Sequence, residues 1–331
     1  MELGFNAEQQ QLADAERSWL SRHDPVSRVR TLLDGEPVST DPDALAHAAE
    51  SGLLGLLTDA IGGSHADLAV LSEIHGHAAS SLPIADLAIT AWLLEAADAP
   101  EAESAADGTA LFGLSHRRAG RQSTGAALLA TPAAGVVVLR SGGGDGDHLV
   151  IAPATVATPM STLDLTRPWF RVGDGLDEFP RRALPPGAAA LAADALSLHR
   201  AIDALGAADR LLQMTIAYAG QREQFGVPIG SFQAVKHHCA DMAIAVEASR
   251  ATLWRTAQNM AAESEAERSR AVAAAAAYAK AAASRVAGTA LQVHGGIGFT
   301  WEHDLHLFLR RIKVDEAMNG TVAEHRDALA G

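Results

Sequence analysis

Three long helical stretches in the second half of the chain constrain the fold most strongly. After Pro185-Pro186-Gly187, apolar residues at three- and four-residue spacing predict helices over 188–220, 232–262 and 265–291, followed by two short ones. The stretch 271–290 is rich in alanine, and small side chains let helix axes approach closely. The sequence therefore predicts a helical bundle with tightly packed members.

The second of these helices carries an apolar stripe, and Ser231 precedes it as the predicted cap. Five residues form the stripe at steps of four, three, four and seven positions: Val235, Cys239, Met242, Val246 and Leu253. We expect this face, including Cys239, to lie in the core.

The remainder of the chain changes character twice. Residues 1–105 predict an N-terminal helical domain, residues 106–186 a reduced β domain of short apolar runs, and residues 187–331 the C-terminal bundle. The predicted fold is mostly α with a small β domain. Its best-defined early elements are helices over 44–52, 67–79 and 84–96 and strands over 134–139 and 148–152.

Composition limits the classes of function. The chain has 331 residues, 48% of them hydrophobic, which is enough for one large or several small cores. No apolar run reaches the roughly 18 residues that span a membrane, and the start is polar, so we expect a cytoplasmic protein without a membrane segment. A net charge of −14 argues against nucleic acid as a partner, and the single Cys239 agrees with a reducing compartment.

Two weaker patterns favour structural interpretations. The glycine-rich run 142–146 has apolar runs on both sides and no following Lys, which predicts a hairpin turn rather than a phosphate loop. His303, Asp304 and His306 have a loose metal-like spacing without a second cluster, so we expect a solvated helix face and no metal site.

Two strings near the ends of the predicted bundle helices suit anion binding. In QREQFGVPIGSFQ (221–233), Arg222 offers a planar fork of donors that matches phosphate, and the glycines and proline turn the following loop sharply. In QVHGGIGFT (292–300), Gln292 supplies an amide donor, and Gly295 and Gly296 let backbone N–H groups approach an anion.

Both strings, with the segment 50–76, resemble acyl-CoA dehydrogenases. The resemblance implies that family's fold, with an N-terminal helical domain, a β domain and a C-terminal four-helix bundle, and it implies FAD as cofactor. In that family the matched positions contact the pyrophosphate and adenosine end of an FAD bound mainly by the neighbouring subunit. The implied cofactor-binding residues are Arg222, Gln224, Gln292, Gly295, Gly296 and Thr321.

Two departures from the family pattern concern catalysis. Asn319, in Met318-Asn319-Gly320-Thr321, lies 21 residues after Gly298, where the family keeps the Glu that removes a substrate proton. An amide cannot accept that proton. Leu196 occupies the alternative base position known in some relatives. The stretch 112–124 lacks the Thr-Glu-Pro and Gly-Ser-Asp pattern that holds the flavin ring and thioester.

The chain is therefore expected to be a subunit without a catalytic residue of its own. It resembles the Glu-lacking half of heteromeric actinobacterial enzymes, heterotetramers in lipid and steroid catabolism that dehydrogenate sterol side-chain acyl-CoA thioesters. The implied partner is a catalytic sister subunit in an α2β2 hetero-oligomer, which binds most of the acyl-CoA.

Three alternatives remain at this point. An active homo-oligomer could use Asp315 or Glu316 as a relocated base, although charged residues there are expected to be solvated. The other two are a flavin-dependent oxygenase on the same fold and a purely structural partner without flavin contact.

Overall fold

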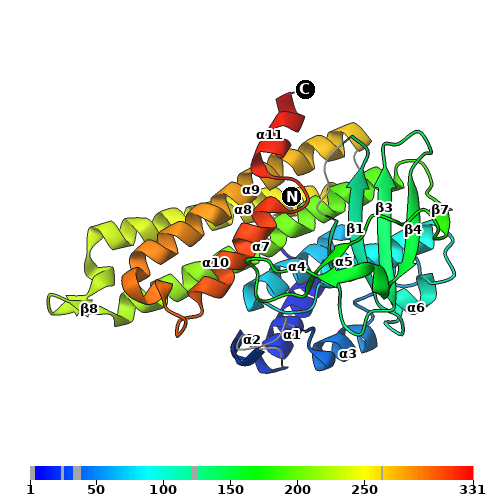
Figure 1. The fold of residues 1–331 in the computed structure, drawn as a ribbon. Helices are drawn as coiled ribbons and strands as arrows, with labels where there is room; N and C mark the ends of the chain where they lie inside the picture. Colours follow the sequence, from blue (N-terminus) through cyan, green and yellow to red (C-terminus); the bar gives the residue numbers. More distant parts are fainter. Residues whose placement is uncertain (1–3, 24–25, 33–38, 121–124, 262–263, 331) are drawn as a thin grey trace.

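In the computed structural model, the described residues are 4–23, 26–32, 39–120, 125–261 and 264–330. They follow the predicted order of helices, strands and helices (Figure 1). A long bundle extends from a compact end, where the early helices and the strands lie together.

The N-terminal part is helical, and each predicted helix is present within a few residues. Ser64 caps the beginning of α4 in a capping box. Its backbone N–H and its hydroxyl donate to the carboxylate of Asp67, and its hydroxyl oxygen accepts from the backbone N–H of Asp67. Pro83 precedes α5 and sets its start. The helices are α1 (Ala7–His23), α2 (Val26–Leu32), α3 (Pro42–Glu50), α4 (His65–Ala78), α5 (Ile84–Ala96) and α6 (Ala102–Ala106).

The β part consists of two small sheets with strand orders β1-β3-β4-β7 and β2-β6-β5. Strands β1 and β3 run parallel, and β3 and β4 form an antiparallel hairpin whose turn contains the run 142–146, as predicted. The last residues of the divergent stretch, 121–124, lie outside the described residues. The strands are β1 (Phe112–Arg118), β2 (Ala126–Leu128), β3 (Gly135–Ser141), β4 (His148–Pro153), β5 (Ala157–Pro159), β6 (Trp169–Val172) and β7 (Arg181–Ala183).

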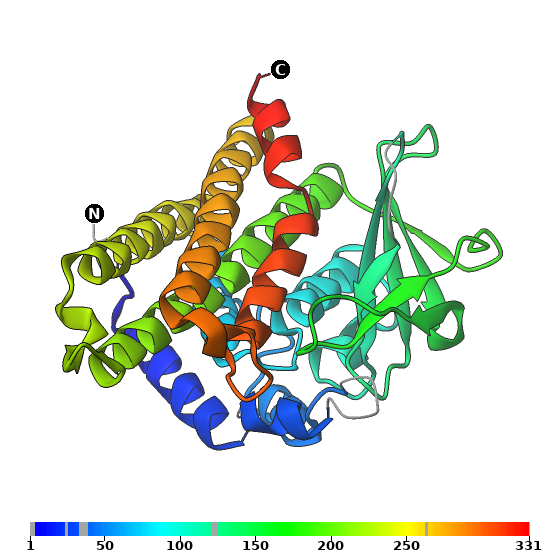
Figure 2. The same cartoon turned by 60° about the vertical axis from the view of Figure 1, so that its left-hand side comes forward.

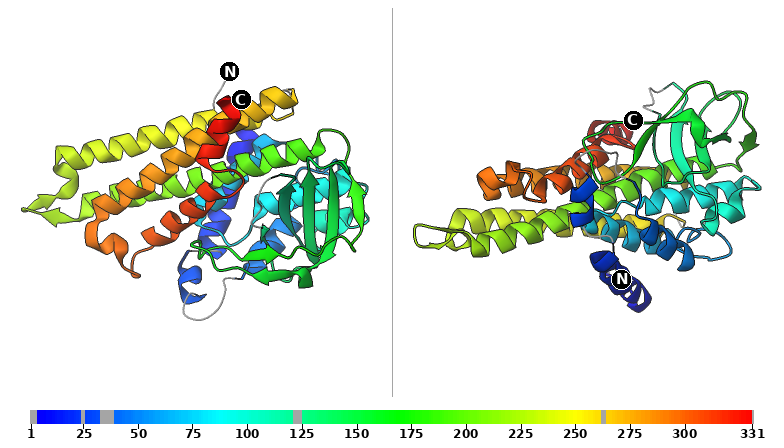
Figure 3. Two further views of the ribbon diagram at one scale, coloured as in Figure 1. Left: turned by 45° about the horizontal axis from the view of Figure 1, so that its top comes forward. Right: turned by 60° about the horizontal axis from the view of Figure 1, so that its bottom comes forward.

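The C-terminal part is the predicted bundle. Helices α7 (Ala188–Gln221) and α9 (Glu265–His294) run away from the sheets, and α8 (Gln233–Asn259) and α10 (Leu305–Ala317) return, as Figure 3 shows. Nine of the thirteen alanines of α9 are buried, which permits its close packing against α7 and α8. A short α11 (Val322–Ala330) packs against α9. No described helix combines the length and apolarity needed to span a membrane.

Two glycines set the crossing of α4 and α7. A Cβ built at Gly76 would collide with the backbone of Asp203, and one at Gly206 would collide with the backbone of Glu73. Each helix therefore presents bare backbone to the other at the crossing point. This contact fixes the N-terminal helices against the bundle.

The structure corrects two predictions for α8. Phe232, rather than Ser231, occupies the cap position, because the Ser231 hydroxyl donates to the carbonyl of Pro228 at 2.7 Å. The apolar stripe is buried from Met242 onward, whereas Val235 and Cys239 are only half-buried. The reason is that the beginning of α8 extends past the early helices, where no described element covers this face.

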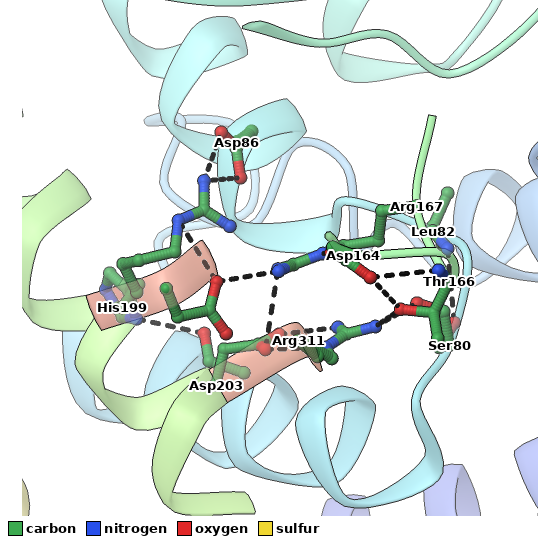
Figure 4. Close-up of polar contacts among 12 residues, drawn as sticks. Ser80, Leu82, Asp86, Asp164, Thr166, Arg167, His199, Asp203 and Arg311 are labelled. Atoms are coloured by element: carbon green, nitrogen blue, oxygen red, sulfur yellow. Dashed lines mark hydrogen bonds and ion pairs between the residues drawn. The ribbon is translucent and has the colours of Figure 1, made fainter. Parts of the chain in front are cut away.

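A buried ion network joins the β part to the bundle (Figure 4). Arg311 of α10 donates to both carboxylate oxygens of Asp203 on α7 at 2.7 Å, and to Thr166 in the loop before β6 at 2.9 Å. Arg167 of the same loop donates to Asp164 and Asp315, both at 2.6 Å. The network therefore links the β part to α7 and α10.

This geometry overturns the expectation for Asp315. The sequence predicts a solvated carboxylate, but Asp315 is fully buried beside Arg167. Arg167 lies 148 positions away in the sequence, so no local pattern reveals the pairing. Burial, which Arg167 only partly opposes, raises the pKa of Asp315 to about 7.

Replacing Arg311 with Met should lower the free energy of unfolding by about 3–5 kcal/mol, because Asp203 is left buried without its main counter-charge. Urea denaturation measures this change. The double variant Arg311→Met/Asp203→Leu should recover most of the loss. Arg326→Met, at an exposed arginine of α11, is the control and should change stability by less than about 0.5 kcal/mol. A single variant as stable as the control would contradict this role.

Candidate functional site

A cleft of about 630 Å³ lies between the sheets and the bundle. Its walls come from β1, β2 and β6 on one side and from α7 and α9 on the other, and the turn after α10 closes one end. Figure 2 shows the sheets beside the beginning of α7 and the end of α10. The volume is in the range of small-molecule sites in proteins.

Asn319 lies in the turn that lines this cleft, between α10 and α11. Its φ is 53°, in the left-handed region that Asn tolerates better than most residues, and Gly320 follows at 97°. A Cβ at Gly320 would lie 2.7 Å from the imidazole of His325, and the φ of 97° strains any residue with a side chain, so glycine suits this position. The local sequence Asn-Gly thus suits a tight turn between two helices.

Three side chains from the bundle hold this turn. Ser197 donates to the backbone carbonyl of Asn319 at 2.8 Å, and Arg200 Nε donates to Asn319 Oδ1 at 3.3 Å. Arg200 is itself fixed, since its Nη2 donates to both oxygens of Asp86 at 2.9 and 3.0 Å. Position 319 therefore faces an immobilised cation.

The third side chain is Lys280 of α9, which is fully buried. Its Nζ donates to the carbonyls of Met318 and Gly320, both at 2.7 Å. Burial lowers the pKa of Lys280 to about 7, although Asp315 opposes this shift. A neutral amine has two N–H groups, which matches the two carbonyls it meets.

The two alternative bases do not face the cleft. Asp315 is enclosed in the ion network, and Glu316 accepts a hydrogen bond from Lys313 at 3.0 Å on the other side of α10. Neither is among the described residues that line the cleft. Leu196 is buried in α7.

Most of the predicted cofactor residues lie at the opposite end of the bundle. Tyr218 stacks on His294 at 4.5 Å, which brings the end of α7 beside the end of α9. Gln292 lies roughly 19 residues along α9 from Ala273 in the cleft wall, a separation of about 28 Å. This distal group comprises Arg222, Gln224, Gln292, Gly295 and Gly296.

The members of the distal group are exposed, and the side-chain donors of Arg222 and Gln292 are open to a ligand. No hydrogen bond or ion pair joins the Arg222 guanidinium to any residue that the structure describes, and Gln292 is solvent-exposed. Gly295 has φ 61°, and no atom lies within 4 Å of a Cβ built at Gly295 or Gly296. The surface around both glycines is therefore open.

Thr321 does not join this group. It follows Gly320 at the cleft end, where its N–H donates to the Glu324 carboxylate at 2.8 Å and its hydroxyl bonds the same group. Thr321 thus caps α11. The predicted cofactor residues are split between the two ends of the bundle.

Phe225 is an exposed residue of the distal end to which the sequence reasoning gave no role. It lies at the tip of the hairpin formed by β8 (Glu223–Gln224) and β9 (Val227–Pro228), and its side chain is 94% exposed. Its φ of 55° followed by 80° at Gly226 is a tight-turn geometry that few residues other than Gly or Asn adopt. A Phe before a Gly between two short strands was the available signal.

Comparisons with known proteins define the class. Residues 191–331 match the family model "Acyl-CoA dehydrogenase, C-terminal domain". Over its whole length the chain is similar in structure to one chain of the ChsE4-ChsE5 complex from Mycobacterium tuberculosis, with a TM-score of 0.84 and 23% identity over 100% of this chain and 98% of that one. The chain shares the fold of these proteins, and its match to the acyl-CoA dehydrogenase family model covers residues 191–331.

Two further proteins are similar to this chain. The steroid acyl-CoA dehydrogenase Tcur3481-Tcur3483, solved as a variant, has a TM-score of 0.84 and 25% identity over 99% of this chain and 98% of that chain. Acyl-CoA dehydrogenase IpdE2 of Mycobacterium tuberculosis is 37% identical over 47% of this chain and 45% of its own length. The matched region thus spans about half of this curated relative. FAD is the cofactor expected for the family.

The stability of the chain should depend on pH through Lys280. Between pH 7 and about 10.4 an unfolded lysine binds a proton that the folded, buried amine does not, so protonation favours unfolding. The free energy of unfolding of the wild type, relative to Lys280→Met, should therefore rise with pH in this window, by at most about 1.4 kcal/mol per unit.

Urea denaturation at pH 7, 8, 9 and 10 measures this difference. Lys313→Met, at an exposed lysine of α10, is the matched control for loss of a lysine. A relative stability that does not rise across this pH range would show that Lys280 is charged in the folded chain.

Proposed function

We propose that this chain is the non-catalytic subunit of an FAD-dependent acyl-CoA dehydrogenase, and that its distal group completes the flavin site of a catalytic sister chain. The observation that carries the proposal is the Arg200–Asn319 contact. Position 319 is where the resemblance implies a proton-accepting carboxylate, and the contact supports the proposal because it holds an amide beside a fixed cation there. An amide does not remove a proton from an acyl thioester.

The chemistry of the distal group fits the pyrophosphate of FAD. Arg222 would pair with phosphate oxygens, Gln292 would donate its amide, and the open backbone at Gly296 would let an anion approach. The exposed ring of Phe225 would pack on the adenine. When bound, FAD would accept a hydride from the β-carbon of the thioester in the partner's site.

The cleft of this chain fits the pyrophosphate poorly. Among the described residues that line it, five carry carboxylates and two are arginines. One of these arginines, Arg200, is already paired with Asp86. An excess of carboxylates repels phosphate, so the two ends of the bundle have opposite electrostatic preferences.

Exposed apolar side chains at the distal end of the bundle support the proposal that a partner chain binds there. Exposed apolar side chains that gather at one part of a surface mark protein interfaces. The residues are Phe225, Val227, Phe232, Ile297, Phe299 and Trp301. The structural likeness to the two-component ChsE4-ChsE5 and Tcur3481-Tcur3483 proteins favours a different chain as the partner, in an α2β2 assembly. A steroid-derived acyl-CoA, bound mainly by the partner, is the proposed substrate class.

The competing function is an active homo-oligomer with a relocated base, and the structure gives it less support. Asp315 is enclosed among arginines, and Glu316 is paired with Lys313 away from the cleft. A base must come within hydrogen-bond reach of the proton that it removes.

Arg222→Ala should weaken flavin binding by the co-purified complex roughly ten- to hundredfold, because a charge-assisted contact worth about 1.5–3 kcal/mol is lost. The flavin absorbance that remains after dialysis measures retention. Arg270→Ala, at an exposed arginine near the other end of the bundle, is the control. Equal retention in both variants would show that Arg222 does not hold the cofactor.

The chain purified alone should not dehydrogenate acyl-CoA, and Asn319→Glu should not create activity. A carboxylate at position 319 would pair with Arg200, which holds its pKa low and makes it a poor base. Reduction of an electron acceptor with a panel of acyl-CoA thioesters measures turnover. Turnover by the single chain, abolished by Glu316→Gln, would instead establish the relocated base.

A further inference from the structure

We infer that the cleft of this chain is itself a binding site, for an uncharged and largely apolar molecule that presents a carbonyl oxygen to the side-chain amide of Asn319. This site lies about 28 Å from the distal group and does not depend on the proposed flavin contact.

The orientation of the Asn319 amide follows from its neighbour. Arg200 can only donate hydrogen bonds, and its Nε donates to Asn319 Oδ1. The amide nitrogen must therefore point away from Arg200. Asn319 is partly exposed in the cleft wall, and no acceptor within the described ranges bonds to its Nδ2. The two N–H groups of Nδ2 therefore have no partner among the described residues, on a side chain that lines the cleft.

Side chains from α7 and α9 hold the turn that presents this amide in one conformation. Ser197, Arg200 and Lys280 together make four hydrogen bonds to the segment 318–320. They keep Asn319 at a positive φ, a conformation that costs energy for a residue with a side chain. A donor fixed in this way loses little freedom on binding, which favours affinity for a matching acceptor.

The walls define the chemical class of the ligand. Leu114, Leu128 and Trp169 of the sheets face Val272 of α9, and Met318 lies beside Asn319. Asp194, Glu265 and Glu324 lie around this apolar part, so phosphate and carboxylate groups are disfavoured. A cationic amine would suit those acids but offers no acceptor to the amide. A ketone or amide on a hydrophobic body satisfies both the walls and the donor.

A matched pair of fluorinated probes tests the site in the full chain, with its partner present if the two co-purify. The ketone is 4,4′-difluorobenzophenone, and bis(4-fluorophenyl)methane has the same rings without the carbonyl. Fluorine NMR titrations give the dissociation constant of each. We expect the ketone to bind roughly five- to tenfold more tightly than the hydrocarbon, the range expected for one hydrogen bond.

Variants locate the interaction. Asn319→Asp keeps the oxygen that accepts from Arg200 but replaces the N–H groups, so the preference for the ketone should disappear. Val272→Trp fills the cleft and should abolish the binding of both probes. Asn259→Leu, at the end of α8, is the control and should bind as the wild type does. Urea midpoints establish that each variant is folded.

Three results would overturn the inference. They are equal affinity of the wild type for the two probes, ketone binding unchanged by both Asn319→Asp and Val272→Trp, or displacement of the ketone by CoA or FAD. Displacement by FAD would also contradict the proposed division between the two ends of the bundle. The first two results would leave the flavin proposal intact, since that is tested through Arg222.

Discussion

Arg167 is the side chain on which the arrangement of the β part against the bundle depends. It extends from the loop before β6 into a set of carboxylates contributed by its own loop, α7 and α10. A buried guanidinium is costly without such partners, so the loop has one stable position. The network holds four aspartates for three arginines, which is consistent with the raised pKa of Asp315. Trp169 follows this loop and lines the cleft, so the network also sets the distance between the sheet and the Asn319 turn.

Two features that a flavoenzyme of this fold needs, donors for phosphate and an enclosed cleft, lie at opposite ends of the bundle. Donors suited to phosphate lie at the distal end, whereas the enclosed space lies at the other end, about 28 Å away. Helices α7 and α9 are continuous between these ends, so no local rearrangement brings them together. Under the proposed function, a second chain supplies the rest of the flavin site that the distal group completes. The beginning of the apolar stripe of α8 is only half-buried, and Phe225 is exposed; both are consistent with contact to a second chain.

The sequence predicted what depends on local spacing. The helix α5 was placed at its observed bounds, and α7 and α9 within a few residues, because apolar periodicity and the flanking Pro and Gly residues determine them. It failed for Asp315 and Ser231. The partner of Asp315 is remote in sequence, and the hydroxyl of Ser231 bonds a nearby carbonyl instead of the helix. Neither the partition of the cofactor residues between two ends nor the role of Lys280 follows from spacing, since both depend on the packing of α9.

The contact between Gly76 and Gly206 has a consequence for how this chain tolerates sequence change. Side chains usually set the distance between helices, so exchanges in a core alter their crossing. At this crossing the spacer is backbone, which no substitution elsewhere can lengthen or shorten. Other apolar residues can replace the surrounding leucines and valines without changing the distance between α4 and α7. Ser197, Arg200 and Asp203 all lie on α7. Such substitutions therefore leave the positions of these three residues relative to α4 unchanged.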